Sequence, residues 1–559
     1  MRKNRKKWLG LTLAAAMTAG TLAGCGNGDG NASQETPGSA GTNEQKEDGQ
    51  ESQAAGSSSE EIPTFKIVTV RWDANWPTDF LTEEGGFMKV MEERAGIQIE
   101  WDIYPYDGWG EQKSLMLASE DLPDAFLGSI TLNASDVISN KDSFVDLTDK
   151  IQNMPNLLHA MEEDPVLRAI CTDTEGKVYS LPKRLAMRPK VNGEVAYINQ
   201  EWLDRLNLEA PKNIEELENV LLKFKTEDAD GDGDPDNEFP ISGNSGNPLH
   251  DDLRGILSPF GTMVSREGNF MGLNNEGVPV FVPVEENYKE AVKWMRGLWE
   301  QGIVDPERFT QDSSTWQAKM QAEGGSQVGI VFAWTSDAAV GLNAGQYVPM
   351  EAVEGLNGIH YLENVSNYLD VTDRELVITK ACEDPDALLR WADSFYTDLA
   401  SLQMTYGEIG TAITDNGDGT YTVETPTDGS SLDIFAWCHS LRDFGPKWMS
   451  PEFDEKVILP SDQGDGAKRA EDPVNEQYVS QDRNIGLPLI HYTEEQTERL
   501  ITLNSDICPY AIGQYAHWVV DGGIEEEWDA YIEQMKVMGL DELIQIHRDA
   551  YEAYLESMK

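Results

Sequence analysis

Large apolar residues alternate with polar ones in two short segments of the N-terminal third of the chain. Residues 65–70 and 97–103 follow this two-residue period, which predicts two β-strands. Between them, residues 87–94 carry apolar side chains at helical spacing, and Gly96 provides the usual end of a helix. A strand, a helix and a strand in close succession predict a βαβ unit with parallel strands.

The same succession of patterns continues along the chain to about residue 400. Further strands and helices are predicted in turn at residues 195–199, 214–224, 288–301, 329–334 and 376–379. Helical and loop patterns dominate afterwards, and the chain ends in two predicted helices over residues 524–558 that Gly539 separates. We therefore predict an α/β fold with a helical C-terminal part.

The first residues of the chain do not follow this globular pattern. A basic start precedes an apolar run from Trp8 to Ala23, which is shorter than the ~20 residues of a membrane-spanning helix. A short apolar run behind a basic stretch is typical of an export signal. The run ends in Leu22-Ala23-Gly24-Cys25, which resembles the cleavage motif of bacterial lipoproteins; a chance cysteine after an ordinary signal peptide is the alternative. We predict a lipoprotein signal peptide over residues 1–24 and a lipid on Cys25.

A lipid on Cys25 implies a membrane anchor. Palmitate-type acylation of this residue supplies more than one acyl chain, which stable anchoring requires. Residues 25–62 are rich in Gly, Ser and acidic residues, with Ile62 as their single large aliphatic side chain, so they are predicted to be a disordered acidic tether. The expected location is the extracellular face of a cell membrane of the Gram-positive type.

Charge and composition narrow the possible partners of the folded body. The chain has 43 Lys and Arg against 99 Asp and Glu, a formal net charge of −56, which repels phosphate backbones and argues against nucleic-acid binding. A hydrophobic content of 40% is sufficient for large cores. The cysteines of the body form no CxxC pair, and both two disulfides and free thiols fit their even number. These cysteines are Cys171, Cys382, Cys438 and Cys508.

Four motifs follow one another in a fixed order along the body. They lie at residues 197–211, 302–309, 383–391 and 527–531, and the second begins Gly302-Ile303-Val304-Asp305-Pro306. Behind a lipoprotein signal and a tether, they resemble the extracellular solute-binding proteins of carbohydrate ABC importers, in the large Gram-positive lipoprotein branch of family 1. One departure is Asn199-Gln200-Glu201, which stands where this family commonly has a run such as Arg-Lys-Asp.

The resemblance implies a two-lobed periplasmic-binding-protein-like fold with hinge-crossing strands near residues 186–196 and 365–374. By the same analogy the N-terminal lobe comprises residues 63–190 and 370–430, and the C-terminal lobe residues 191–369 and 431–559. The implied function is that of a lipid-anchored, monomeric binding subunit. It captures an oligosaccharide or sugar derivative in the interlobe cleft and delivers it to the permease subunits of an ABC importer.

An acidic loop over residues 228–239 is the most distinctive chemical feature of the body. Its carboxylates at loop positions 1, 3 and 5, with Gly233 at position 6, match the beginning of a calcium-binding loop. It departs from an EF-hand at its end, where Phe239 occupies position 12. A solvated acidic turn is the alternative, but its carboxylates repel one another without a cation. We predict structural Ca²⁺ bound by Asp228, Asp230, Asp232, Asp234, Asp236 and Glu238.

Candidate ligand-binding residues lie next to the predicted strand ends. Aromatic rings stack on the apolar face of a sugar, while charged side chains bond to its hydroxyls, and ligands of open α/β sheets bind near the carboxyl ends of the strands. The candidates chosen on this basis are Trp72, Trp76, Tyr106, Trp109, Arg184, Trp334, Asp370 and Trp437. Core packing is the alternative role of each tryptophan, because the chain has fifteen of them.

Three other classes of protein remain as alternatives at this stage. A surface-tethered glycan hydrolase needs paired carboxylates. In so acidic a chain, such pairs occur by chance and do not indicate a hydrolase. The sequence has no HExxH, GxSxG or Walker motif, and its seven His lack metal-ligand spacing. A calcium-stabilised adhesin is disfavoured because the chain shows no repeats. A binder of peptides rather than sugars has the same lobes and stays open. We expect no catalytic residues.

Overall fold

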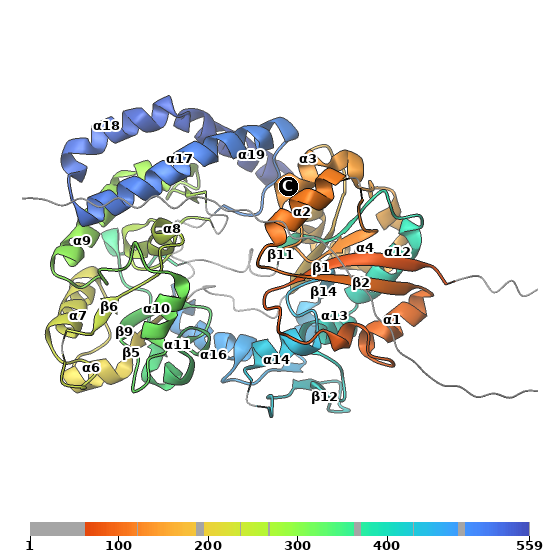
Figure 1. The fold of residues 1–559 in the computed structure, drawn as a ribbon, viewed down its shortest axis with the longest axis horizontal. Helices are drawn as coiled ribbons and strands as arrows, with labels where there is room; N and C mark the ends of the chain where they lie inside the picture. Colours follow the sequence, from red (N-terminus) through yellow and green to blue (C-terminus); the bar gives the residue numbers. More distant parts are fainter. Residues whose placement is uncertain are drawn as a thin grey trace, which may run out of the picture. The chain divides into compact units, whose positions relative to one another are not determined.

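The computed structural model describes residues 62–557 except residues 120, 186–194, 235, 266–268, 363–370, 429 and 479–486. The expected signal peptide, Cys25 and nearly all of the tether lie outside the described residues. Among the helices of the described part, none is both long and apolar enough to cross a membrane. The elements build two bodies around two separate sheets, which we call the first and second lobes (Figure 1).

The first lobe is built on a six-stranded sheet with the order β14-β4-β11-β3-β1-β2. Its strands are β1 (Thr64–Arg71), β2 (Gln98–Pro105), β3 (Ala125–Leu127), β4 (Leu181–Leu185), β11 (Val371–Ile378) and β14 (Lys447–Met449). β1 runs parallel to β2 from Thr64↔Gln98 to Arg71↔Pro105, which confirms the predicted βαβ unit. β11 is antiparallel to both of its neighbours, so the sheet is mixed.

Helices cover both faces of this sheet, because its strands carry apolar residues on both sides. Ile67 belongs to one buried cluster and Val68 to another on the opposite face. The helices are α1 (Phe87–Ala95), α2 (Trp109–Ser119), α3 (Ala134–Ser139), α4 (Pro155–Glu163), α5 (Pro165–Cys171), α12 (Pro385–Asp393) and α13 (Asp398–Tyr406). An appendage adds α14 (Leu432–His439), α15 (Pro451–Asp454) and a small sheet of β12 (Ile413–Asp415), β13 (Tyr421–Val423) and β15 (Val457–Ile458).

The second lobe is built on a four-stranded sheet with the order β10-β5-β9-β6. Its strands are β5 (Val195–Asn199), β6 (Phe239–Ile241), β9 (Val328–Ala333) and β10 (Tyr347–Pro349), and a hairpin joins β7 (Met271–Leu273) to β8 (Pro279–Phe281). Its helices are α6 (Gln200–Leu206), α7 (Ile214–Thr226), α8 (Pro248–Arg254), α9 (Glu286–Glu300), α10 (Ser313–Met320) and α11 (Ser336–Val340). Asn199, the departure noted in the sequence, caps α6 by accepting from Trp202 N at 3.2 Å.

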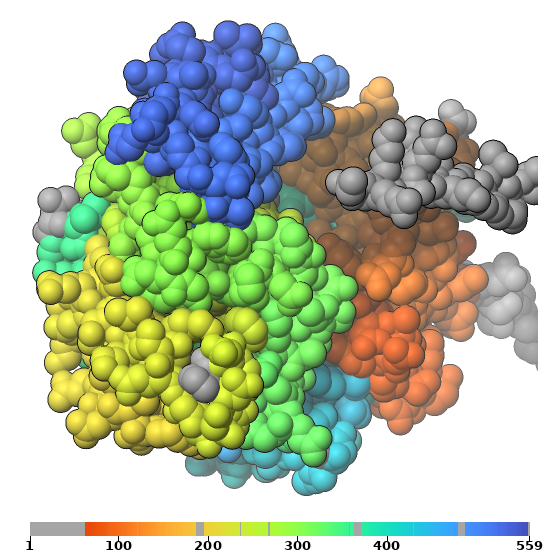
Figure 2. Space-filling model, turned by 60° about the vertical axis from the view of Figure 1, so that its left-hand side comes forward, coloured from red at the N-terminus to blue at the C-terminus, as the bar shows by residue number. Residues whose placement is uncertain are grey.

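Three helices close the chain: α17 (Glu494–Val520), which was not predicted, and the two predicted ones, α18 (Ile524–Val537) and α19 (Leu540–Ser557). They share one buried cluster with α7, α8 and α9 of the second lobe. Figure 2 shows these helices in blue, resting on the green surface of that lobe. Gly539, with a φ of 102°, separates α18 from α19 in a conformation that favours glycine.

The chain passes between the two sheets at both predicted places. β4 belongs to the first sheet and β5 to the second, and the residues between them are 186–194; the return to β11 follows residues 363–370. A third connection, which the sequence analysis missed, is helix α16 (Gly464–Glu476). The predicted lobe boundary at residue 430 is too early, because β14 pairs with β4 in the first sheet.

Helix α16 is anchored in both lobes by buried polar contacts. Near its start, Asp465 lies 3.1 Å from Arg442 and accepts a hydrogen bond from Tyr406, both in the first lobe. Near its end, Asn475 Oδ1 accepts from Ala352 N of the second lobe at 2.7 Å. Asp465 is 0% and Asn475 4% exposed, so neither anchor is a surface contact.

Candidate functional site

Aromatic side chains gather where β1 and β2 end in the first lobe. Trp72 directly follows β1 and Tyr106 directly follows β2, and their ring centroids are 4.6 Å apart. Parallel strands in register deliver both rings to the same edge, the carboxyl edge at which α/β sheets bind ligands. Trp72 is 43% and Tyr106 48% exposed, so both present ring surface to solvent.

Rings from the C-terminal part of the first lobe extend this group. Trp437 of α14 stacks on Trp76 with centroids 5.7 Å apart and planes 28° apart. Phe444 lies 5.0 Å from Trp437 and 6.1 Å from Trp72, so it links the two pairs. We call Trp72, Trp76, Tyr106, Trp437 and Phe444 the first-lobe aromatic cluster. Phe444 was not predicted, because it lies in a coil that follows no strand pattern.

Trp334 is the candidate that the second lobe contributes. It directly follows β9, is half-buried, and lies over the ammonium group of Lys468 of α16, with Nζ 5.1 Å from the ring centroid. Lys468 Nζ is also 3.7 Å from Glu471 Oε2, which accepts from the Tyr197 hydroxyl at 2.8 Å. Burial raises the pKa of Glu471, and the adjacent lysine lowers it in part.

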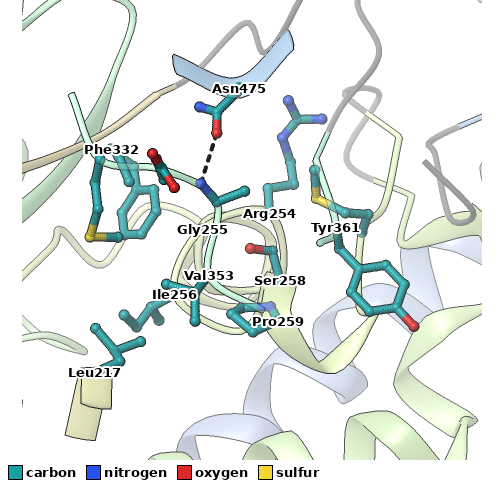
Figure 3. Close-up of a pocket in the computed structure, with 15 residues that line it drawn as sticks. Leu217, Arg254, Gly255, Ile256, Ser258, Pro259, Phe332, Val353, Tyr361 and Asn475 are labelled. Carbon is teal, nitrogen blue, oxygen red and sulfur yellow. Dashed lines mark hydrogen bonds between the residues drawn. The ribbon is translucent and has the colours of Figure 1, made fainter. Parts of the chain in front are cut away.

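A pocket opens beside this group in the second lobe (Figure 3). Apolar walls come from Phe332 of β9 and from the segment between α8 and the turn at Ser258, while Tyr361 lies at the opposite side. Arg254, Glu351 and Asn475 add charged and amide groups. Gly255 allows close contact here, because a Cβ at this position would lie 3.1 Å from the Phe332 ring. None of these lining residues was singled out from the sequence.

Two predicted ligand residues have structural partners instead. Trp109 is 3% exposed, and its indole N–H donates to the Thr131 carbonyl at 2.9 Å, so it is a core residue of the first lobe. As the first residue of α2, it points inward, whereas Tyr106 before it points outward. Arg184 of β4 forms an ion pair with Asp164 at 2.7 Å. Asp370 lies outside the described residues.

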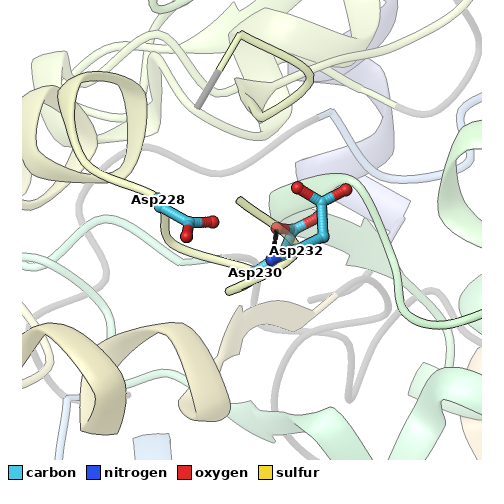
Figure 4. A group of neighbouring side chains, drawn as sticks. All are labelled: Asp228, Asp230 and Asp232. Carbon is cyan, nitrogen blue, oxygen red and sulfur yellow. Dashed lines mark hydrogen bonds between the residues drawn. The ribbon is translucent and has the colours of Figure 1, made fainter. Parts of the chain in front are cut away.

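The acidic loop brings three of its predicted ligands together (Figure 4). Carboxylate oxygens of Asp228, Asp230 and Asp232 lie within 4.8 Å of one another. The loop turns through Gly231 and Gly233, whose φ values of 78° and 93° favour glycine. Burial, the largest cause, and the neighbouring carboxylates raise the pKa of Asp230, while the nearby Arg205 lowers it in part.

Glu238 is the fourth group with the character of a metal ligand. It is 0% exposed, and while Oε1 accepts from Ala229 N at 2.9 Å, Oε2 is buried without a hydrogen-bond partner. Burial raises the pKa of this carboxyl. Asp234 and Asp236 are exposed and lie outside the group of three. The donor set consists of oxygen atoms alone, which suits a hard cation such as Ca²⁺.

Comparison with known proteins places this geometry in context. No protein-family model matches the chain. The fructooligosaccharide ABC transporter substrate-binding protein FusA of Streptococcus pneumoniae is 29% identical over 521 residues, which cover 89% of this chain and 91% of that protein. The polygalacturonan/rhamnogalacturonan-binding protein YtcQ of Bacillus subtilis is 26% identical over 241 residues, covering 42% and 44% of the two chains.

Solved structures agree with this relationship over nearly the whole folded body. An HMO-binding, ABC-transporter-associated solute-binding protein from Bifidobacterium longum infantis has a TM-score of 0.76 and 25% identity, covering 88% of this chain and 99% of that one. An EF-hand mutant of FusA from S. pneumoniae, in complex with fructo-nystose, has a TM-score of 0.75 and 25% identity over the same shares. The chain is therefore a homologue of the substrate-binding proteins of ABC transporters, with their two-lobed fold, and the resemblance carried by its sequence motifs is confirmed.

Proposed function

We propose that the protein is the substrate-binding subunit of an ABC importer and captures an oligosaccharide or sugar derivative. The observation that carries this proposal is the pairing of two aromatic sites, the first-lobe aromatic cluster and Trp334 of the second lobe. Trp72 and Tyr106 of the cluster, like Trp334, directly follow a sheet strand, as expected of a site between two α/β lobes. The relatives named for binding oligosaccharides support the class of ligand.

The mechanism follows from the chemistry of these side chains. Exposed faces of Trp72 and Tyr106 offer apolar surface for the C–H side of a sugar ring, and Trp334 offers a second surface from the other lobe. Polar groups of the second-lobe pocket, such as Arg254 and Asn475, are placed to bond to hydroxyls. A ligand that contacts both lobes stabilises a closed arrangement by its differential affinity for it, and the closed lobes dock on the permease.

Calcium has a structural part in this proposal. Asp228, Asp230 and Asp232 with the buried Oε2 of Glu238 would hold Ca²⁺ on the second lobe. The cation would offset the charge of the carboxylates that raise the pKa of Asp230. The existence of an EF-hand mutant of FusA indicates that this relative has such a loop. Because no aromatic candidate belongs to the loop, the expected effect is on stability.

The N-terminal segment supplies the location in this proposal. Lipidation of Cys25 anchors a monomer to the extracellular face of the membrane, beside the permease, and residues 26–62 give the lobes reach. Labelling with a radioactive or alkyne-bearing palmitate, in cells that express the protein and a Cys25→Ala control, tests the anchor. Label in both proteins would contradict it.

A saccharide panel tests the main proposal. We expect one oligosaccharide to raise the melting temperature and to bind in calorimetry without being cleaved, as analysed by chromatography after prolonged incubation. Steady release of shorter sugars would instead identify a hydrolase, and stabilisation by peptides alone would identify a peptide binder. Trp334→Ala serves as the control variant for specific binding. It removes the proposed ring surface without touching the core of either sheet, so it should weaken binding and remain folded.

A further inference from the structure

Three arginines are buried in the described part of the chain, and one of them differs from the others. Arg71, Arg308 and Arg442 are 2%, 1% and 1% exposed. Arg308 pairs with Asp252 at 2.9 Å, and Arg442 pairs with Asp465 at 3.1 Å. Arg71 has no carboxylate of the described residues at ion-pair distance. Burial of a guanidinium without an anion is costly, so this exception requires a reason.

The contacts of Arg71 leave one edge of its guanidinium unused. The group lies against the rings of Phe80 and Trp437, with its central carbon 5.3 and 5.5 Å from their centroids. Nη1 approaches the Ser440 carbonyl at 3.5 Å, at the limit of a hydrogen bond. Nε and Nη2 are buried and have no hydrogen-bond partner. Two adjacent donors therefore have no acceptor among the residues that the structure describes.

These two atoms form the edge with which an arginine grips a carboxylate. The protein itself gives an example on its surface, where Arg499 donates from Nε and Nη2 to the two oxygens of Glu542 at 2.7 and 2.6 Å. Such a pair of parallel bonds is stronger and more specific than a single bond. In Arg71 the same edge has no partner among the described residues, and desolvation by burial lowers the pKa of the group to about 10.

The position of Arg71 connects this edge to the candidate ligand site. Arg71 is the last residue of β1, directly before Trp72, and Trp437 of the first-lobe aromatic cluster covers it. Trp76 stacks in turn on Trp437. The guanidinium thus lies against a buried ring of the cluster whose Trp72 and Tyr106 are exposed to a ligand.

We propose that the Nε–Nη2 edge of Arg71 receives the carboxylate of an acidic sugar, so that the ligand is a uronate-containing oligosaccharide. The inference rests on the function proposed above and specifies its substrate class. A hydroxyl would satisfy the N–H donors but leave the charge uncompensated, whereas a carboxylate does both. Entry of the carboxylate displaces the stacked Trp437 and Trp76 rings, which sugar rings replace as stacking partners.

Matched acidic and neutral ligands test this inference on the purified protein. Oligogalacturonates and oligoglucuronates are compared in calorimetry with their methyl esters, which remove the charge and change the shape little, and with uncharged oligosaccharides. We expect an acid to bind about tenfold to a hundredfold more tightly than its ester, the size of a charged hydrogen bond. Arg71→Gln should abolish this preference, while Arg390→Gln, at an exposed position of the same lobe, should retain it.

The remaining outcomes separate the two proposals. If esters or uncharged saccharides bind as tightly as the acids, the proposal of an acidic ligand is overturned. The proposed function of binding a saccharide would then still stand. An acid preference that survives in Arg71→Gln would overturn the role of Arg71. Failure of every saccharide to bind would overturn the proposed function itself. Should Arg71→Gln not fold, Arg71→Lys keeps the charge without the fork and should reduce the preference, with circular dichroism melting as the folding check.

Discussion

The two lobes place a cation behind a candidate tryptophan in opposite ways. In the second lobe, Lys468 supports Trp334 and has Glu471 3.7 Å away, so its charge is compensated within the protein. In the first lobe, Arg71 supports Trp437, and no carboxylate of the described part of the chain lies at ion-pair distance from it. A compensated cation fixes a ring and contributes to the fold, whereas an uncompensated one weakens the fold and is available to a ligand. The difference assigns positioning to Lys468 and recognition to Arg71.

The largest expected effect separates these two cations by stability. Lys468→Met leaves Glu471 buried without its cation and should destabilise the protein by about 3 kcal/mol in urea unfolding. Arg71→Met removes a buried charge that has no partner and should change stability by less than about 1 kcal/mol. Equal losses of unfolding free energy in the two variants would contradict the proposed difference between the two cations.

The loss of stability in Lys468→Met should depend on pH. Burial raises the pKa of Glu471 above its ordinary value, so its protonated form is favoured in the folded state. A carboxyl group of this kind contributes stability below its unfolded pKa and loses it as pH rises through the folded pKa. Without Lys468 the folded pKa rises further, so the deficit of Lys468→Met should shrink as pH falls from 7 toward 5. A deficit that is constant across this range would point to lost packing instead.

Calcium removal should affect the second lobe next. A ligand present at a hundred times its dissociation constant stabilises the native state by about 2.7 kcal/mol, which chelation removes. We expect EDTA to lower the melting temperature and Asp230→Asn to abolish that response. Because the loop lies on the second lobe, hydrogen exchange should increase first around α7 and β6, which flank it. A uniform increase over both lobes would contradict this localisation.

Single ring deletions should have smaller, unequal effects on binding. Trp334 is the one candidate ring that the sequence analysis found in the second lobe, so Trp334→Ala should weaken saccharide binding by about tenfold, while Trp334→Phe retains most of the affinity. Trp72→Ala should cost less, because Tyr106 at 4.6 Å from it continues to offer a ring surface. Calorimetry at fixed ionic strength measures both. A greater loss of affinity in Trp72→Ala than in Trp334→Ala would show that the first lobe contributes more to saccharide binding.

The smallest expected effect concerns the cysteines. The four cysteines of the described residues are free, and burial raises the pKa of Cys171 and Cys508 to about 12, so they are protonated thiols at neutral pH. Dithiothreitol should leave the melting temperature unchanged. A fall on reduction would reveal a disulfide.

Features that depend on neighbouring residues were predictable from the sequence. The βαβ unit around β1 and the acidic loop at Asp228 follow from local alternation and spacing, and both occur in the structure. Trp72 and Tyr106 were found because strand ends are visible in the pattern. Trp109, three residues after Tyr106, is instead buried in the core, a difference in orientation that the pattern of strand ends does not show.

Features that depend on distant parts of the chain were not predictable. Lys468 reaches Trp334, and Phe444 joins Trp72 to Trp437, only because α16 and the segment before β14 return to the strand ends. The free edge of Arg71 is equally invisible, because a sequence does not show which carboxylates fold beside a cation. The boundary at residue 430 was misplaced for the same reason, since the pairing of β14 with β4 is long-range.

Helix α16 has a consequence for how a ligand experiences the two lobes. A single flexible linker would let the lobes separate, and a ligand held by one would find the other rarely. Two chain crossings and a helix whose Asp465 and Asn475 are buried at opposite ends limit that separation. In the proposed function, a sugar held by the first lobe would therefore meet Trp334 at a high effective concentration. The second contact then adds to affinity with little further loss of translational entropy, as in a bivalent ligand.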